Sequence, residues 1–201
     1  DPKENDGIFR YILNTWSGIY RRSFIEKYHI RHNTTPGASF QDNGFWFQTF
    51  CLAKRVYFVN RPYYMNRRDN PNSSVKSRKK VYCMNEEYRF IHDFLDRHPE
   101  LKPYFIKVYS MQRFRNYFTT YNRIDRKFRK EYLKTMSEEL READRKNELD
   151  QKYFTPFEWK KIVKIMKDPS SAGVWMAVST SARRMKQSIR NLRRVVNGKR
   201  I

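Results

Sequence analysis

The chain has few cysteines, few glycines and no long apolar run, and each shortage excludes a class of protein. Cys51 and Cys83 are its only cysteines; they lie in apolar helical patterns without CxxC or Cys/His spacing, so we expect reduced core thiols in a cytoplasmic protein. No stretch reaches the roughly 20 apolar residues that a membrane-spanning helix needs. The six glycines form no phosphate-binding loop, and no Asp-x-Asp motif occurs.

Basic residues dominate what the sequence does contain. Lys and Arg total 43 against 21 Asp and Glu, which gives a formal net charge of +22. Such a charge favours an anionic partner, which could be nucleic acid, acidic lipid headgroups or a phosphorylated substrate. The 39% hydrophobic and 16% aromatic content are typical of a folded domain in a chain of 201 residues. Because the chain starts at Asp1 without a Met, we expect it to be part of a longer one.

The first third of the sequence predicts a short mixed α/β region. β-branched and aromatic residues fill 55–59, the clearest strand pattern in the chain, and 63–67 predicts a second short strand. A Pro-Gly turn at 36–37 and the apolar residues that follow it predict a helix over 39–53. We therefore expect a short mixed α/β region at residues 8–66, within a first unit of residues 1–78.

From Lys79 onward, apolar residues recur at intervals of three and four, which is the period of amphipathic helices. The predicted helices cover residues 79–97, 103–121, 126–147 and 156–168. Thr155 followed by a proline is typical of an N-cap and first helical position, so it marks the start of the last of them. The sequence thus predicts a helical region over residues 79–170.

Residues 171–201 combine an apolar start with a strongly basic end that has no acidic residue after Arg183. Trp175 would anchor the start, and apolar side chains would share one helical face opposite the charges. This pattern is typical of an interfacial helix on anionic lipid, at the inner face of the plasma membrane. The alternative is an ordinary amphipathic helix packed on the helical region. The membrane-binding candidates are Trp175, Arg183, Arg184, Lys186, Arg190, Arg193 and Arg194.

Asp42 is the leading candidate for chemistry. It falls in the first turn of the predicted 39–53 helix, among aromatic and small residues. The free N–H groups of that turn would hold its pKa low and fix its position. A plain alternative is a carboxylate that only caps the helix. His29, His32 and His92 have no ligand spacing, so we expect packing or solvated roles for them and no metal site in this chain.

Several segments, taken in order, resemble one enzyme family. They are Trp16 to Ile25, Pro36 to Phe50, Arg55 to Val59, Arg61 to Arg67 and Asn72 to Ser74. Together they are similar to the C-terminal half of bacterial family 2 glycosyltransferases of the GT-A fold, enzymes that build capsule, exopolysaccharide and other surface glycans. The resemblance covers about residues 14–95. It implies a few-stranded α/β fragment of a GT-A domain, followed by a predominantly helical region.

The resemblance also implies a reaction, the inverting transfer of a sugar from a nucleotide-sugar donor to a glycan or lipid-linked acceptor. Asp42 would be the catalytic base, and Gln41, which stands where the family commonly has Glu, would be a substrate-binding residue beside it. Arg67 would stabilise the leaving diphosphate. The sugar pocket would be lined by three aromatic residues, Trp16, Tyr20 and Trp46, and the alternative for each of them is aromatic packing in the core. A Mg or Mn ion would bind an Asp-x-Asp motif outside this sequence, and we expect this chain alone to be inactive.

Two other classes of function stay open. A nucleic-acid-binding module would fit the pI of 10.1 and the interleaved aromatic and basic residues of 109–129. Against it, no nucleic-acid motif is present, and the basic residues are spread over several predicted helices. A non-catalytic interaction domain would use the 126–147 helix and the basic tail as contact surfaces.

Overall fold

The computed structural model describes residues 1–11, 15–35, 40–65 and 80–178. Three 3-10 helices are η1 Asp6–Arg10, η2 Thr15–Ser17 and η4 Gln151–Tyr153. The α-helices are α1 Arg22–Lys27, α2 Asp42–Leu52, α3 Cys83–Arg97, α4 Lys102–Arg123, α5 Arg126–Arg145 and α6 Pro156–Lys167. Residues 169–178 are also helical. The helices predicted from the 3.6-residue period are therefore confirmed.

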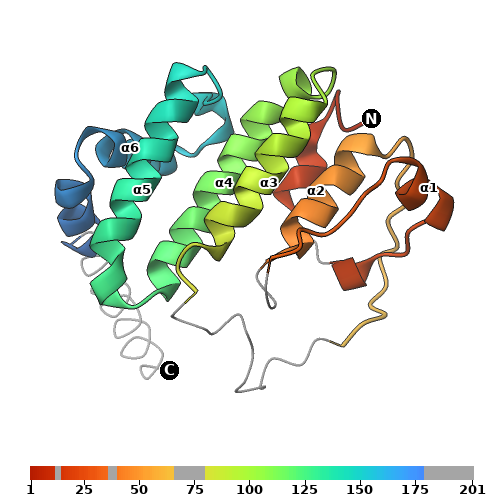
Figure 1. Ribbon diagram of the computed structural model, residues 1–201, viewed down its shortest axis with the longest axis horizontal. Helices are drawn as coiled ribbons and strands as arrows, with labels where there is room; N and C mark the ends of the chain where they lie inside the picture. Colours follow the sequence, from red (N-terminus) through yellow and green to blue (C-terminus); the bar gives the residue numbers. More distant parts are fainter. Residues whose placement is uncertain (12–14, 36–39, 66–79, 179–201) are drawn as a thin grey trace, which may run out of the picture.

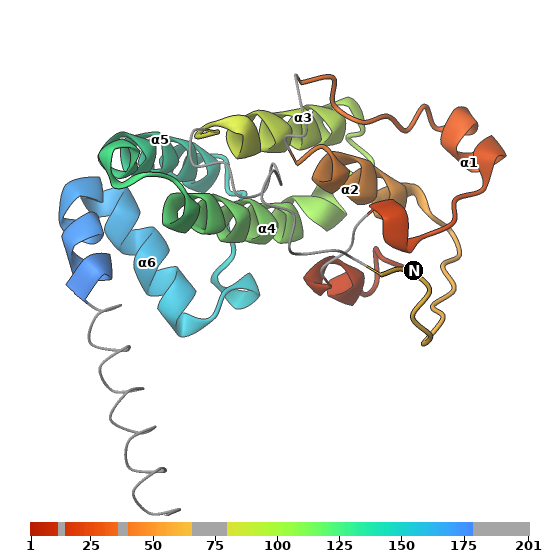
Figure 2. The same ribbon diagram turned by 90° about the horizontal axis from the view of Figure 1, so that it is seen from below.

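The longer helices lie side by side in a row that runs along the long axis of the molecule, with α6 and α1 near opposite ends of the row (Figure 1). Helix α3 packs against α2 and α4, and α5 packs against α4 and α6. Seen from below, α3 and α5 lie on one side of the bundle and α4 and α6 on the other (Figure 2). None of the helices in the described part of the chain is long and apolar enough to cross a membrane.

The predicted α/β fold is wrong. The described ranges contain helices and irregular segments but no strand. Residues 54–65, here called the extended segment, contain no helix or strand and are exposed, with Tyr57 at 90% and Phe58 at 62%. A strand exists only through hydrogen bonds to a neighbouring strand. No other described segment pairs with 55–59, so its β-forming residues remain an exposed extended segment.

One hydrophobic core runs through the described helices. It extends from Phe9 in η1 through α2 to Met176 near the end of the described residues. Helix α4 lies deepest, since its buried side chains lie on more than one face. Buried hydroxyl groups find partners there: Tyr109 Oη donates to the Tyr88 carbonyl oxygen at 2.8 Å. Such bonds offset the cost of taking a hydroxyl group out of water.

The start of α6 confirms the N-cap predicted at Thr155. The Thr155 hydroxyl accepts a hydrogen bond from the Glu158 N–H at 3.2 Å, and the Glu158 carboxylate accepts one from the Thr155 N–H at 2.8 Å. This reciprocal pair satisfies two N–H groups that a helix start leaves without partners. Arg115 on α4 donates to both oxygens of Glu158, at 2.8 and 3.1 Å, and so joins α6 to the bundle.

Candidate functional site

Asp42 is the first residue of α2, where the chain turns sharply into the helix. Phe40 has a φ of 73°, a left-handed conformation that is uncommon for a residue with a side chain. The turn is held by Asn43, whose backbone N–H and side-chain amide both donate to the Phe40 carbonyl oxygen, at 3.0 and 2.9 Å. The half-buried Asp42 side chain therefore projects from a fixed first turn.

The pKa of Asp42 is raised above its ordinary value of 3.8, because burial disfavours the ionised carboxylate. Hydrogen bonds from the N–H groups of Asp42 and Asn43 and the nearby His32 act in the opposite direction without overcoming burial. The prediction of a low pKa was wrong in its sign. It counted the N–H groups of the helix start and could not count the burial that tertiary packing adds.

A second carboxyl group, Glu87 on α3, lies against the first turn of α2. It is 0% exposed and its Oε1 accepts a hydrogen bond from the Gly44 N–H at 2.7 Å. Burial raises the pKa of Glu87 to about 7; Gly44 and Asn33 oppose that rise and the charge of Asp42 adds to it. The site thus combines a half-buried carboxylate at a helix start with a buried carboxyl group behind it.

Glycine at position 44 is what allows this approach. A Cβ there would lie 2.4 Å from Glu87 Oε1 and 2.9 Å from Phe90 Cδ1, closer than non-bonded atoms come. Glu87 was absent from the sequence-based site because its partner lies 43 residues earlier in the chain. The one available signal was a lone glycine inside an otherwise apolar helix, which points to close packing without naming the neighbour.

Aromatic rings form one side of the site. His32 Nδ1 donates to the Gln41 carbonyl oxygen at 3.2 Å, since a carbonyl can only accept. The His32 ring stacks on Phe45 with centroids 4.5 Å apart, and Tyr20 meets the same Phe45 ring edge-on at 5.2 Å. Tyr20 is half-buried, and burial raises its pKa. The predicted pocket residue Tyr20 therefore reaches the Asp42 region through Phe45, and His32 joins it as a residue that the sequence analysis assigned to packing or solvent.

Two other predicted pocket residues lie elsewhere. Trp46 is buried, 5% exposed, with its ring 5.3 Å from Phe9 in the core, so it presents no free face to a sugar. Trp16 is 44% exposed, and its ring lies 5.9 Å from Tyr64 on the extended segment. Periodicity indicates which positions are apolar, but only packing decides which of them remain exposed.

Gln41 does not direct its side chain at an open site. Its amide nitrogen donates to the carbonyl and hydroxyl oxygens of Thr35, both at 3.0 Å. These bonds tie the segment before α2 to the turn that carries Asp42. Gln41 therefore supports the turn in this structure, whereas the resemblance implied a substrate-side position for it.

Several predicted residues lie outside the described ranges. They are Arg67 and the basic tail residues Arg183, Arg184, Lys186, Arg190, Arg193 and Arg194. Trp175 is described: it is half-buried on the helical residues 169–178, with its ring 5.7 Å from that of Phe157. The ammonium groups of Lys160 and Lys164 lie 5.8 and 5.3 Å from the centroid of the same indole.

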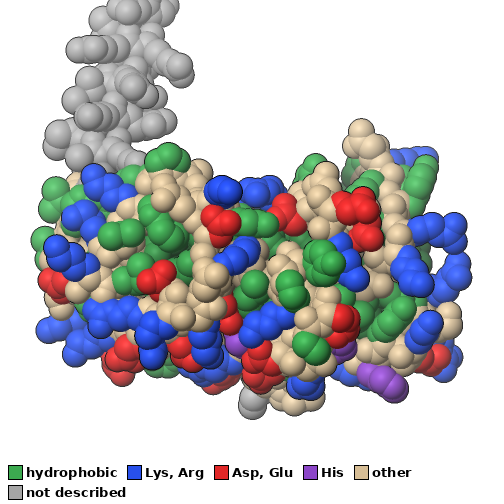
Figure 3. All heavy atoms as spheres, turned by 90° about the horizontal axis from the view of Figure 1, so that it is seen from above, with side chains coloured by type: hydrophobic (Ala, Val, Ile, Leu, Met, Phe, Trp, Pro, Cys, Tyr) green, Lys and Arg blue, Asp and Glu red, His purple; other side chains and the backbone are tan. Residues whose placement is uncertain are grey.

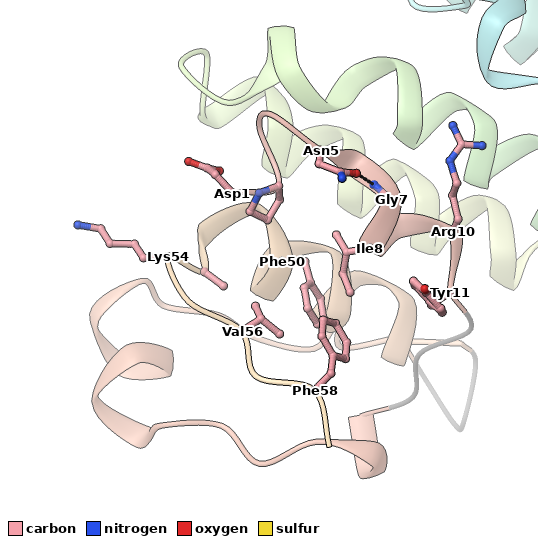
Figure 4. Close-up of a pocket in the computed structure, with 12 residues that line it drawn as sticks. Asp1, Asn5, Gly7, Ile8, Arg10, Tyr11, Phe50, Lys54, Val56 and Phe58 are labelled. Carbon is pink, nitrogen blue, oxygen red and sulfur yellow. Dashed lines mark hydrogen bonds between the residues drawn. The ribbon is translucent and has the colours of Figure 1, made fainter. Parts of the chain in front are cut away.

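A separate open cavity of about 590 Å³ lies between η1, the end of α2 and the extended segment (Figure 4). Its lining is mainly apolar, with Ile8, Phe50 and Phe58 directed toward one another, and Arg10 and Lys54 at its edges. The Asn5 side chain caps η1 beside it by accepting from the Gly7 N–H at 2.9 Å. Asp42 is not among its lining residues, so the cavity and the carboxylate site are distinct features.

One group of described residues has metal-ligand spacing: His92, Asp93 and Asp96 on α3. Most of its members already have partners. His92 pairs with Asp96 at 3.0 Å and with Glu148 at 2.9 Å, and Lys102 binds both of those carboxylates. These contacts form an ion-pair network that links α3 to Lys102 at the start of α4 and to Glu148 after α5. The side chains around Asp42 do not form such a group within the described ranges.

Charge on the face shown in Figure 3 is interspersed: basic side chains occur across the whole face, with acidic ones between them, and do not gather in one stripe.

Comparisons of the chain with protein-family models, with curated proteins and with solved structures found no match. Function therefore has to be inferred from the residues and their geometry, above all from Asp42 and Glu87.

Proposed function

We propose that this chain carries the catalytic base of an inverting glycosyltransferase, and that the base is Asp42. The observation that supports it is the setting of Asp42, a half-buried carboxylate on a fixed first helical turn whose pKa is raised by burial. A general base works best with a pKa closer to the working pH than that of a solvated carboxylate. The ordered resemblance of residues 14–95 supplies the reaction class.

In the proposed reaction, Asp42 takes the proton of an acceptor hydroxyl while that oxygen bonds to the anomeric carbon of a nucleotide-activated sugar. The bond from the anomeric carbon to the diphosphate oxygen breaks, so the configuration inverts. Tyr20 and His32 would offer ring faces to the sugars, and Arg67 would stabilise the diphosphate. Any divalent ion would be held by an Asp-x-Asp motif outside this sequence, where it would neutralise charge on the diphosphate.

We also propose that the enzyme acts at an anionic membrane surface. Its support is the end of the bundle where Trp175 lies beside Lys160 and Lys164 on α6. Next to this cluster, Val174 and Val178 are 67% and 64% exposed. Exposed apolar side chains with an interfacial tryptophan and lysines match the chemistry of an anionic lipid surface.

The test of the base is Asp42→Asn in the enzyme complete with its donor-binding part. We expect the transfer rate to fall about 10²–10⁴-fold while the fold is retained, measured as release of nucleoside diphosphate from a panel of nucleotide sugars. Asp144→Asn on the exposed face of α5 is the control and should leave the rate unchanged. Equal activity of both variants would leave the interaction-domain alternative as the better account.

The test of the surface uses vesicles of phosphatidylcholine with and without phosphatidylglycerol. Lys160→Glu with Lys164→Glu should weaken partitioning to the anionic vesicles by about tenfold or more. Lys130→Glu with Lys134→Glu on α5 changes the charge equally at the same spacing and should have a smaller effect. Tight, salt-dependent binding to single-stranded oligonucleotides without vesicle binding would instead support the nucleic-acid alternative.

A further inference from the structure

The carboxyl group of Glu87 reaches α2 at the turn that carries Asp42. Its Oε1 accepts from the Gly44 N–H, one of the N–H groups that a helix start leaves without a partner inside the helix. None of the described groups completes a hydrogen bond to the other oxygen, Oε2, which is also buried. A fully buried carboxyl group with one unpaired oxygen is poorly stabilised as an anion, although hydrogen bonds from the Gly44 N–H and the Asn33 side chain favour that form.

The contact is built by packing. Gly44 is buried, and the space that its missing Cβ leaves is filled by Glu87 Oε1 and the ring of Phe90. Since Gly44 is two residues after Asp42, the first turn of α2 cannot move without changing this contact. The position of the Asp42 carboxylate is thus linked to a side chain on a different helix.

We propose that Glu87 is a positioning residue for Asp42: as a neutral acid it holds the first turn of α2 through the Gly44 N–H, so that Asp42 alone carries the negative charge. This inference depends on the proposed role of Asp42 as a base. Two neighbouring carboxyl groups in unequal surroundings divide their roles, the more buried one remaining protonated. Ionisation of Glu87 strengthens its bond to the Gly44 N–H but places a second negative charge beside Asp42, and the repulsion between the two carboxylates displaces Asp42 from its aligned position.

The groups that act on this pair come from three parts of the fold. Asp42 on α2 raises the pKa of Glu87, and His32 on the preceding segment lowers that of Asp42. On α3 the neighbour is Tyr88, whose own pKa is raised mainly by burial and further by Glu87. Arg113 on α4 acts on Tyr88. Asp42 is therefore the charged group that reports the ionisation of Glu87 most directly.

The experiment is a pH titration of the chain labelled with ¹³C at its carboxyl carbons, followed by NMR. We expect the Glu87 signal to titrate at about pH 7 and the Asp42 signal to show a second, smaller shift at the same pH. Glu87→Gln stays neutral and keeps an acceptor for the Gly44 N–H, so the second Asp42 shift should vanish. Glu138→Gln, an exposed change on α5, should preserve it.

A Glu87 signal that titrates near its ordinary value of 4.5 would overturn the proposal, and the wild-type chain alone decides this even if Glu87→Gln does not fold. An Asp42 signal that ignores the ionisation of Glu87 would overturn it as well. In the complete enzyme, Glu87→Gln should extend the plateau of kcat to higher pH with little change in KM. If the Asp42 signal shifts as Glu87 titrates but Asp42→Asn retains full transfer activity, the two carboxyl groups are linked and the assignment of Asp42 as the base is wrong.

Discussion

Two regions of the molecule differ in how far their large apolar side chains are buried. In the helical body, residues 80–178, large side chains such as Phe105 and Tyr109 are fully buried. Most of the exposed large hydrophobic residues lie before residue 66, among them Tyr57 at 90% and Met65 at 97%. Helices satisfy their backbone groups internally and need only apolar contacts, whereas an extended segment also needs a strand beside it.

The candidate site lies where the two regions meet. Asp42 and Gly44 belong to α2, the helix that follows the irregular N-terminal segments, while Glu87 belongs to α3 of the helical body. The body therefore supplies the fixed support and the N-terminal region supplies the reactive carboxylate. This arrangement suits a preorganised base, because the contact with α3 adds to the hydrogen bonds of Gln41 and Asn43 that hold the first turn of α2.

The largest expected effect separates the two regions by stability. Phe105→Ala removes a fully buried ring from the body and should lower the free energy of unfolding by about 3–5 kcal/mol. Tyr57→Ala on the exposed segment should change it by less than about 0.5 kcal/mol. Urea denaturation of both variants measures the difference. A large loss for Tyr57→Ala would mean that the segment is packed in solution.

Gly44→Ala tests the junction between the regions. Its Cβ would lie 2.4 Å from Glu87 Oε1, so we expect a loss of about 1–3 kcal/mol in unfolding free energy from overpacking. Combining it with Glu87→Ala should cost less than the sum of the two changes, since the closest clash, with Glu87 Oε1, disappears and only the contact with the Phe90 ring remains. Gly173→Ala, whose nearest contact is a flexible Leu133 methyl at 3.2 Å, should be close to neutral. Strict additivity would contradict the contact.

Stability should also depend on pH through Glu87. Its pKa is raised from 4.5 in the unfolded chain to about 7 in the folded one, so the folded state binds the proton more tightly. The resulting stabilisation is fully present below pH 4.5 and is lost as the pH rises to about 7, a change of up to about 3 kcal/mol. Denaturation across this range should show the loss, and Glu87→Gln should remove most of it. An unchanged pH profile in that variant would assign the dependence to other groups.

The smallest expected loss of stability comes from the N-cap of α6, which lies wholly within the helical body. Thr155→Ala removes the N-cap of α6 and should cost about 1 kcal/mol. Thr119→Ala, which removes a hydroxyl bonded within α4 to the Arg115 carbonyl, should cost less because helix interiors do not need that bond. Thermal unfolding of the two variants measures the difference. An equal loss of stability would mean that the Thr155 cap contributes no more than the Thr119 hydroxyl.

The sequence predicted the helices after residue 79 because their signal is local: each amphipathic period and the Thr155 cap can be seen within a few residues. It failed at 55–59, where the strand pattern is real but the partner strand is missing from the described residues. Asp42 was found through its place at a helix start. Glu87 was missed, and the sequence left open whether Trp46 lies in the core or in a pocket, because both depend on residues far away in sequence.

The most direct test of the account is the pKa of Asp42 in the wild-type chain, measured by ¹³C NMR of its carboxyl carbon. A base seated in a half-buried site predicts a midpoint above the ordinary value of 3.8, with a further shift as Glu87 ionises. A carboxylate that only caps α2 would titrate at or below 3.8, since the N–H groups of the helix start favour its ionised form. That second result would contradict the central claim.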